Sequence, residues 1–580
     1  MTSSQLWEMN ATDAVKALKQ KEIQPSELIE STIGRIEVVD EKVNALPIRC
    51  FERAFEQAKV FEALGDNGGP KNLQGLPIVV KDYNDVGGVR TTYGSPIFSD
   101  YVPKNSDATV ELLEARGAIP IAKSNVPEWA GGHTFNPVHG ITRNPWNTNL
   151  SAGGSSGGSA VALATGQAWL ATGNDLGGSL RTPAGFNGVA GLRPSPGVVP
   201  RGKRLQPFDT LWVEGPMGRS VADVALMLDA GAGHMADDPL SFNSSIESYV
   251  AVLKEAALPK RIGFSNGLGI LPVAKDVANV TEVAVKKLVD LGIDVTDDIP
   301  DFSGVLEAFH TLRAVLLGTM MGELLETYRD RISEDIVGNI EQGFTITPED
   351  LFHAERLRWD LIQRMMVFFE THDLLLCPSA SISPFPVEQR FVTEIDGRIC
   401  ETYIDWFAIT FAITMTSCPV MSIPCGFTKD VLPVGLQVVG RPRGEAALLQ
   451  AAHKLEQISE YRLRHGEAVA IGIALDCIYA RDMEFLSATD CDRIIRLLAR
   501  LGFNLWSNDL LHTDTDGKLV VIEGLEEFRE HLGGCLTITL LKSIGQDFEV
   551  NEMNLPKVLN AIHELQDRTR DKSDSKVIPA

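Results

Sequence analysis

The chain has 580 residues, of which 44% are hydrophobic and 22% are charged. These values are ordinary for a folded protein and exclude disorder as the class of the whole chain. The net charge is −24, which argues against nucleic acid as a partner, because binding to a phosphate backbone depends on clustered cations. A chain of this length can bury a large core without disulfide bonds. At roughly 150 residues per domain, we expect about four units, or one large domain plus an extra one.

The eight cysteines are scattered and form no Cys-x-x-Cys pair, which excludes a zinc ribbon or a thioredoxin-like motif. Residues 1–20 lack a basic segment followed by an apolar run. We therefore expect no signal peptide and a cytoplasmic protein with reduced thiols. Two long uncharged stretches, 151–174 and 406–427, are interrupted by glycines and prolines, so they resemble buried elements and predict no membrane contact.

Helical patterns alternate with short strand-like runs over the first 450 residues. The first 60 residues look helical, with Thr12 and Ser26 as candidate N-caps. The apolar runs predict strands at 75–80, 118–122, 261–264 and 373–377. The intervening patterns predict helices at 107–116, 220–231 and 274–291. This alternation predicts an α/β fold with a mixed β-sheet core that helices cover on both faces.

Three pieces that could carry chemistry follow one another in this region: Lys81 after an apolar run, the loop GGSSGGS at 153–159, and Ser179 after two glycines. Hydrolysis of an amide needs an activated nucleophile, a base that removes its proton, and donors for the oxyanion. Lys81 can be that base only if it is neutral, and burial would lower its pKa in that direction. The glycine-rich turn before Ser179 could direct backbone N–H groups at one oxygen.

Each piece alone has a more ordinary interpretation. The glycine/serine loop could be a flexible linker or could hold a phosphate, and Lys81 could be a solvent-facing anchor at a strand end. However, the loop is flanked by the helix-like AVALATG and the strand-like AWLATG. A phosphate-binding P-loop also needs a lysine after its glycines, and none is present. The three pieces in this order therefore favour the catalytic interpretation.

Together these pieces resemble the amidase signature family over about residues 5–450. The resemblance extends to GITRNPWN at 140–147 and to PVMSIPCGF and LPVGLQVVG within 419–440. It implies an amidase-signature fold and a hydrolase that cleaves the C–N bond of small-molecule carboxamides through an acyl-enzyme. The resemblance implies no cofactor and no metal.

The resemblance also implies a role for each residue of the site. Ser179 is similar to the nucleophile, Ser155 to a bridging serine in a cis peptide bond, and Lys81 to the catalytic base. The oxyanion hole would be formed by the backbone N–H groups of Leu176, Gly177, Gly178 and Ser179. The residues expected to support the triad without reacting are Ser156, Asp175 and Arg181. The residues expected near the substrate pocket are Trp129, Phe135 and the helix at 310–330.

The chain changes character near residue 450. The sequence AAHKLEQISEYRLRHGEAVAIG resembles sugar-phosphate cyclases of the 3-dehydroquinate synthase type, in which HGEAVA supplies a zinc-binding histidine. His453 and His465 match two histidines of that family, whereas Leu449 stands where another zinc ligand would be. A zinc site needs at least three protein ligands, so we expect a catalytically inactive segment that binds neither zinc nor NAD.

We therefore expect an amidase domain at 1–450, a truncated, mainly helical cyclase-like segment at 451–570 and a disordered tail at 571–580. Because the rest of a cyclase is missing, the apolar faces of this segment should pack on the amidase, pack on another copy or remain partly exposed. A homo-oligomer is left open. Two other functions also remain open: the amidase subunit of a tRNA-dependent glutamine amidotransferase, and a scaffold protein whose fused tail impairs the site.

Overall fold

The computed structural model describes residues 3–64, 72–255, 257–458, 465–500, 505–511, 519, 521–522 and 537–574. The chain divides into two compact units, Met1–Tyr461 and Arg462–Ala580. Among the described helices, none is long and apolar enough to cross a membrane.

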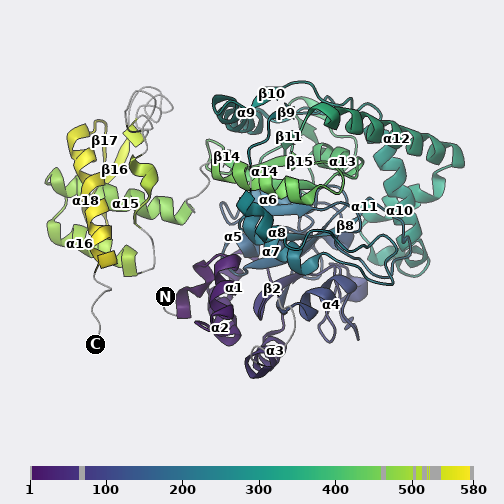
Figure 1. Ribbon diagram of the computed structural model, residues 1–580, viewed down its shortest axis with the longest axis horizontal. Helices are drawn as coiled ribbons and strands as arrows, with labels where there is room; N and C mark the ends of the chain where they lie inside the picture. The colour runs from purple at the N-terminus through teal and green to yellow at the C-terminus, as the bar shows by residue number, and fades with distance from the viewer. Residues whose placement is uncertain are drawn as a thin grey trace. The chain divides into compact units, whose positions relative to one another are not determined.

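A mixed 11-stranded sheet forms the centre of the first unit (Figure 1). In order across the sheet, its strands are β1 (Ile48–Arg49), β3 (Ala118–Ser124), β2 (Leu76–Lys81), β6 (Leu170–Asp175), β8 (Val213–Gly218), β7 (Ala190–Arg193), β14 (Val420–Phe427), β15 (Pro433–Val439), β11 (Leu374–Pro378), β9 (Arg261–Phe264) and β10 (Asp294–Thr296). β2 is parallel to β3 and β6, whereas β6 is antiparallel to β8. The four strands predicted from apolar runs are therefore confirmed as β2, β3, β9 and β11.

Side chains of the central strands alternate between two helical layers. In β2, Val79 packs into one layer, and Ile78 and Val80 pack into the other. The layer on the Val79 side contains α2 (Pro25–Val43), α3 (Phe51–Leu64), α5 (Gly157–Ala164), α6 (Arg181–Asn187), α10 (Val305–Tyr328), α12 (Pro348–Thr371) and α13 (Ala408–Thr414). The opposite layer contains α1 (Ala11–Lys19), α4 (Ala108–Ala115), α7 (Val221–Gly231), α8 (Tyr249–Val252), α9 (Lys275–Asp290) and α14 (Glu445–Ile458). This arrangement confirms the predicted α/β fold with helices on both faces.

The predicted helices at 107–116, 220–231 and 274–291 are confirmed as α4, α7 and α9. The two candidate N-caps are wrong. Helix α1 begins after Asn10, and α2 begins after Gln24, whose side chain and that of Glu27 form a reciprocal capping box. Pro25 occupies the first turn of α2. Proline is favoured there because its missing N–H would have no partner inside the helix.

The second unit has a hydrophobic core of its own. It contains α15 (His465–Asp482), α16 (Ala488–Arg500), the antiparallel strands β16 (Ile538–Ser543) and β17 (Gln546–Val550), and α18 (Leu555–Asp574). The residues that meet in this core include Ala474, Ile478, Cys491, Leu540 and Leu565. We expected the apolar faces of this segment to pack on the amidase, to pack on another copy or to remain partly exposed. Many of them instead pack against one another and against β16, whereas Leu497 and Leu555 stay exposed.

The structure also corrects the predicted C-terminal tail. Helix α18 extends to Asp574, so residues 571–574 are helical, and 575–580 lie outside the described residues. Residues 451–458 belong to α14, whose Leu448, Ala452 and Leu455 are buried in the core of the first unit. These residues, expected to open the cyclase-like segment, thus pack on the large sheet.

Candidate active site

Lys81 ends strand β2 and is fully buried. It lies two residues beyond Val79, so its side chain points to the same face of the sheet. Its Nζ atom lies 2.7 Å from Ser155 Oγ, 2.8 Å from Ser156 Oγ and 2.6 Å from Asn174 Oδ1. The structure therefore brings the predicted base and the predicted bridging serine into direct contact.

Burial lowers the pKa of Lys81 from its ordinary value to about 7, although the negative charges of Glu214 and Asp175 act in the opposite direction. Burial removes water from the ammonium group, and this loss of hydration disfavours the charged form of the lysine. Close to neutral pH, a large fraction of Lys81 can therefore carry a free lone pair.

The glycine/serine loop is buried throughout residues 153–159, which a flexible linker would not be. The peptide bond between Gly154 and Ser155 is cis, as the family resemblance implies. A Cβ atom on Gly154 would lie 2.3 Å from the carbonyl oxygen of Gly132, so only glycine allows this close passage of the two backbones. The N–H of Ser156 donates to the carbonyl oxygen of Ser179 at 3.2 Å, which joins the loop to the turn that carries the predicted nucleophile.

Asp175 holds that turn in place. Its carboxylate accepts the N–H of Gly178 and the N–H of Leu180, each at 3.0 Å. This contact corrects one part of the predicted oxyanion hole, because the N–H of Gly178 is already engaged. The N–H groups of Leu176, Gly177 and Ser179 have no hydrogen-bond partner in the part of the chain that the structure describes, and they remain the candidate donors.

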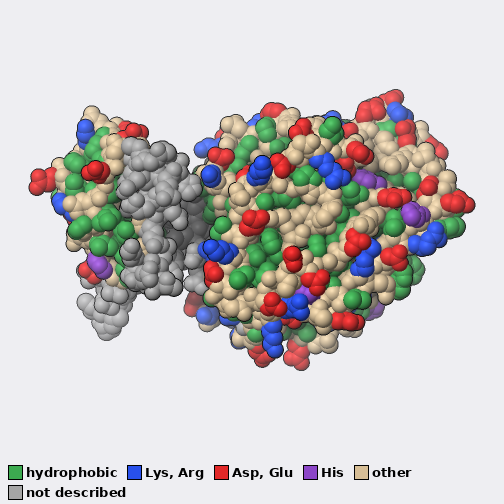
Figure 2. Space-filling model, turned by 90° about the horizontal axis from the view of Figure 1, so that it is seen from above, with side chains coloured by type: hydrophobic (Ala, Val, Ile, Leu, Met, Phe, Trp, Pro, Cys, Tyr) green, Lys and Arg blue, Asp and Glu red, His purple; other side chains and the backbone are tan. Residues whose placement is uncertain are grey.

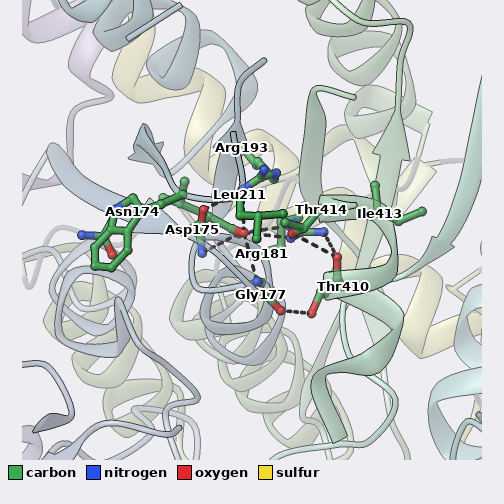
Figure 3. Close-up of polar contacts among 12 residues, drawn as sticks. Asn174, Asp175, Gly177, Arg181, Arg193, Leu211, Thr410, Ile413 and Thr414 are labelled. Carbon is green, nitrogen blue, oxygen red and sulfur yellow. Dashed lines mark hydrogen bonds and ion pairs between the residues drawn. The ribbon is translucent and has the colours of Figure 1, made fainter. Parts of the chain in front are cut away.

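Two buried arginines neutralise Asp175 (Figure 3). Arg181 forms two hydrogen bonds with its carboxylate, at 2.8 and 3.0 Å, and Arg193 Nη1 lies 3.3 Å from Asp175 Oδ1. Burial alone would raise the pKa of Asp175, but the two guanidinium charges and the hydrogen bonds outweigh it and hold the pKa well below its ordinary range. Asp175 therefore stays ionised and orders the turn, as expected for a supporting residue.

Helix α13 fixes the same turn from the other side. The hydroxyl of Thr410 donates to the carbonyl oxygen of Gly177 at 2.6 Å, and Arg181 Nη1 donates to the carbonyl oxygen of Thr410 at 2.7 Å (Figure 3). Arg181 Nη2 also donates to Thr414 Oγ1 at 2.9 Å. The turn before Ser179 is thus tied to β6, to α6 and to α13, which makes its backbone groups rigid.

A pocket opens onto Ser179. Its lining residues are Trp129, Gly132, Asn174, Leu176, Gly177, Ser179, Trp212, Phe309, Arg313, Leu317, Ile404, Phe407 and Phe411. Trp129 and the helix at 310–330 thus lie where they were expected. Phe135 instead lines a second pocket, which shares Gly132 with the first.

Two polar residues of the site, Asn174 and Arg313, were not singled out from the sequence, although Arg313 lies on the helix expected near the pocket. Asn174 is the last residue but one of β6, and its contact with Lys81 depends on the pairing of β2 with β6. Arg313 is a single cation within the apolar stretch AFHTLRAVLLG of α10. An isolated charge on the apolar face of a predicted helix is the signal that could have pointed to it.

Among the described residues, no group of three histidine, cysteine, aspartate or glutamate side chains is placed to hold a metal ion. His453 lies on α14, where its Nε2 is 3.0 Å from Gln457 Nε2. The side chain of His465 lies outside the described residues. No zinc site is therefore assembled around His453 in the part of the chain that is described.

Comparison with known proteins agrees with the geometry. The Amidase family model matches residues 27–449, and a model for the 3-dehydroquinate synthase C-terminal region matches residues 450–520. The chain is 32% identical over 469 residues to an acylamidase of Rhodococcus erythropolis, covering 79% of this chain and 97% of the relative. It is 33% identical over 501 residues to a glutamyl-tRNA(Gln) amidotransferase subunit of Moorella thermoacetica, covering 81% of this chain and 100% of the relative.

Solved structures give the same result. A bacterial aryl acylamidase of the amidase signature family superposes with a TM-score of 0.73 at 26% identity, covering 78% of this chain and 96% of that structure. The 6-aminohexanoate cyclic dimer hydrolase superposes with a TM-score of 0.71 at 26% identity, covering 78% and 98% of the two chains. The chain therefore belongs to the amidase family of enzymes, which hydrolyse amide C–N bonds.

Proposed function

We propose that the first unit hydrolyses small carboxamides through a Ser179–Ser155–Lys81 triad and an acyl-enzyme intermediate. The observation that carries this proposal is the contact of the buried Lys81 Nζ with Ser155 Oγ at 2.7 Å, next to a pocket lined by Ser179. A buried lysine with a pKa near neutrality, beside hydroxyl groups, has the properties of a general base.

The three contacts of Lys81 Nζ indicate which hydroxyl gives up its proton. Asn174 Oδ1 can only accept a hydrogen bond, and Ser156 Oγ donates its own proton toward the carbonyl oxygen of Asn174 at 3.5 Å. A neutral lysine has two N–H donors, and these two oxygens accept both of them. The remaining lone pair faces Ser155, so Ser155 is the hydroxyl that can transfer a proton to Lys81.

In this mechanism Ser155 in turn accepts the proton of Ser179 as Ser179 attacks the substrate carbonyl. The oxyanion accepts hydrogen bonds from the free N–H groups of Leu176, Gly177 and Ser179, which Asp175 and Thr410 hold in place. The proton then returns to the leaving amine, and the C–N bond breaks. Water attacks the acyl-enzyme by the same relay, which releases the acid and restores the serine.

The pocket supports aryl or alkyl amides as substrates. Most of its lining is aromatic or aliphatic, and Phe309 stacks on Phe411 with ring centroids 4.0 Å apart. The test is turnover of an aryl and alkyl amide panel by the purified chain, together with labelling by a fluorophosphonate and mass spectrometry of the labelled peptide. The proposal expects turnover without partner proteins and a label on Ser179. A label on another residue would refute the assignment of the nucleophile.

The amidotransferase subunit is a second candidate, favoured by the 33% identity to the whole Moorella relative. It would release ammonia from glutamine and would need partner subunits to use it. Steady turnover of simple amides by the isolated chain, with glutamine as a poor substrate, would exclude it. The scaffold alternative would be supported by the absence of both turnover and labelling.

We further propose a cytoplasmic enzyme whose partner is a small-molecule amide. In the described part of the chain the cysteines are free, and Cys377, Cys418 and Cys425 are buried thiols. Acidic and basic side chains are interspersed over the face of the first unit that Figure 2 shows, and the net charge of −24 disfavours nucleic acid. Size-exclusion chromatography with light scattering tests whether the chain forms a homo-oligomer.

A further inference from the structure

We propose that Arg313 recognises a carboxylate on the substrate, so that the preferred substrates are amides with an apolar body and an acidic group. This inference rests on the proposed function. Arg313 lines the same pocket as Ser179 and is only 7% exposed. A guanidinium is permanently charged, and burying it is costly unless an anion compensates it.

The protein supplies no such anion within ion-pair distance in the part of the chain that the structure describes. Arg313 Nη2 donates to the hydroxyl of Tyr403 at 2.6 Å, and Nη1 donates to Asn339 Oδ1. Both acceptors are neutral. They orient the guanidinium and satisfy two of its N–H groups, and the Tyr403 ring lies 5.6 Å from the guanidinium carbon, but no anion balances the charge among the described residues.

The acidic side chains on the neighbouring segments have partners of their own. Asp405 lies 3.2 Å from His310 Nε2, and Asp335 lies 2.8 Å from Arg390 Nε. Glu128 has neutral donors as its partners, the hydroxyl of Ser95 at 2.8 Å and the N–H of Ser333 at 3.1 Å. Because none of these three carboxylates forms an ion pair with Arg313 among the described residues, the charge of Arg313 is available to a ligand.

The rest of the pocket is mostly apolar and indicates that the ligand carries an apolar body beside its carboxylate. Phe309 and Leu317 stand on either side of Arg313 along α10, and Trp129, Trp212 and Phe407 complete an apolar wall. The pocket lining contains no acidic side chain among the described residues. In such surroundings a charge-assisted contact between guanidinium and carboxylate is stronger than in water. An apolar amide that ends in a carboxylate therefore matches both parts of the pocket.

The test compares matched pairs of substrates. Acetanilide is compared with 4-acetamidobenzoate, which places the acid on the amine side, and butyranilide with succinanilate, which places it on the acyl side. The readout is the ratio of kcat/KM between the two members of a pair, because this ratio does not depend on the fraction of folded enzyme. We expect the wild type to favour the acidic member of at least one pair by about 10-fold or more.

Replacing the guanidinium should remove this preference. We expect Arg313→Met to lower the ratio about 10- to 100-fold and Arg313→Lys to retain part of it. The matched control is Arg331→Met, which removes an exposed arginine from the second pocket and should leave the ratio unchanged. A preference for the neutral member in both pairs, or an Arg313→Met ratio equal to that of the wild type, would overturn the inference.

A binding assay separates this inference from the proposed function. 4-Phenylbutyrate should slow fluorophosphonate labelling of the wild type more than 4-phenyl-1-butanol does, and Arg313→Met should abolish that difference. Equal protection by the two compounds, in an enzyme that is labelled on Ser179, overturns the role of Arg313 alone. Absence of both labelling and turnover refutes the proposed function and this inference with it.

Discussion

The pH dependence of acylation tests the central chemical claim, that Lys81 acts as a neutral base. With a pKa of about 7, about half of Lys81 is neutral at pH 7, whereas an ordinary lysine with a pKa of about 10.4 would be neutral in roughly 1 molecule in 2,500. A base must be deprotonated to act, so activity is present above this pKa and is lost as the pH falls through it. We expect kcat/KM to rise about tenfold between pH 6 and a plateau above pH 8.

The variant Glu214→Gln should shift this profile, because the negative charge of Glu214 raises the pKa of Lys81. Its two carboxylate oxygens accept hydrogen bonds from Asn84 Nδ2 at 3.3 Å and from Trp212 Nε1 at 3.2 Å. An isosteric glutamine keeps the shape of the side chain and one of the two acceptor oxygens. Glu214→Gln removes the interaction of this negative charge with Lys81, which is about 1–2 kcal/mol. The midpoint of the pH profile of kcat/KM should therefore move to lower pH by roughly one unit.

The assay measures kcat/KM for an anilide from pH 5 to 9 at constant ionic strength, with a solvent isotope effect to establish that proton transfer limits the rate. Lys81→Ala should lose both the rate and the ascending limb. The matched control is Glu388→Gln, an exposed carboxylate on the same chain, which should leave the midpoint in place. A profile that is flat between pH 6 and 9, or a Glu214→Gln midpoint at higher pH than the wild type, would show that Lys81 is not the base.

The nucleophile, the buried ion cluster and the second unit can each be tested separately. Ser179→Ala should lower turnover by at least about 10³-fold and abolish fluorophosphonate labelling at an unchanged melting temperature; retention of a tenth of the wild-type rate would show that Ser179 is not the nucleophile. Asp175→Asn should lower the free energy of unfolding of the first unit by roughly 3–5 kcal/mol in urea denaturation, because it leaves two buried guanidinium groups without their anion. The control Asp301→Asn replaces an exposed carboxylate and should change the free energy of unfolding by less than about 0.5 kcal/mol. Truncation after residue 461 should retain amide turnover. Elemental analysis of the full chain should find no stoichiometric zinc. Stoichiometric zinc that is lost in His465→Ala would contradict the expectation of a zinc-free second unit.

The local elements of this protein were predictable because they depend on short-range patterns. Runs such as LPIVVK are apolar on both faces and have few alternatives to a buried strand, which is why β2 and β3 lie where they were expected. Helix α9 was predicted to within one residue at each end for the same reason. The starts of α1 and α2 were missed because several polar residues compete for the N-cap position, and tertiary contacts decide between them.

The three reactive residues could be named from the sequence alone because their identity and order resemble a known family. Their surroundings could not. The pKa of Lys81 depends on its complete burial between Ser155, Ser156 and Asn174, and these residues come from separate elements that only the sheet pairing brings together. Gly178 was predicted as an oxyanion donor because the sequence cannot show that Asp175 already accepts its N–H.

The fold class, the order of the reactive residues and the change of family near residue 450 can be read from the sequence. Three other features appear only in the folded chain: α14 completes the core of the first unit, the second unit has its own core, and Arg313 faces the pocket of Ser179 without an anionic partner among the described residues. Composition and periodicity indicate which side chains of a segment are buried, but not what they contact. The partner of a buried charge is set by contacts between segments that lie far apart along the chain.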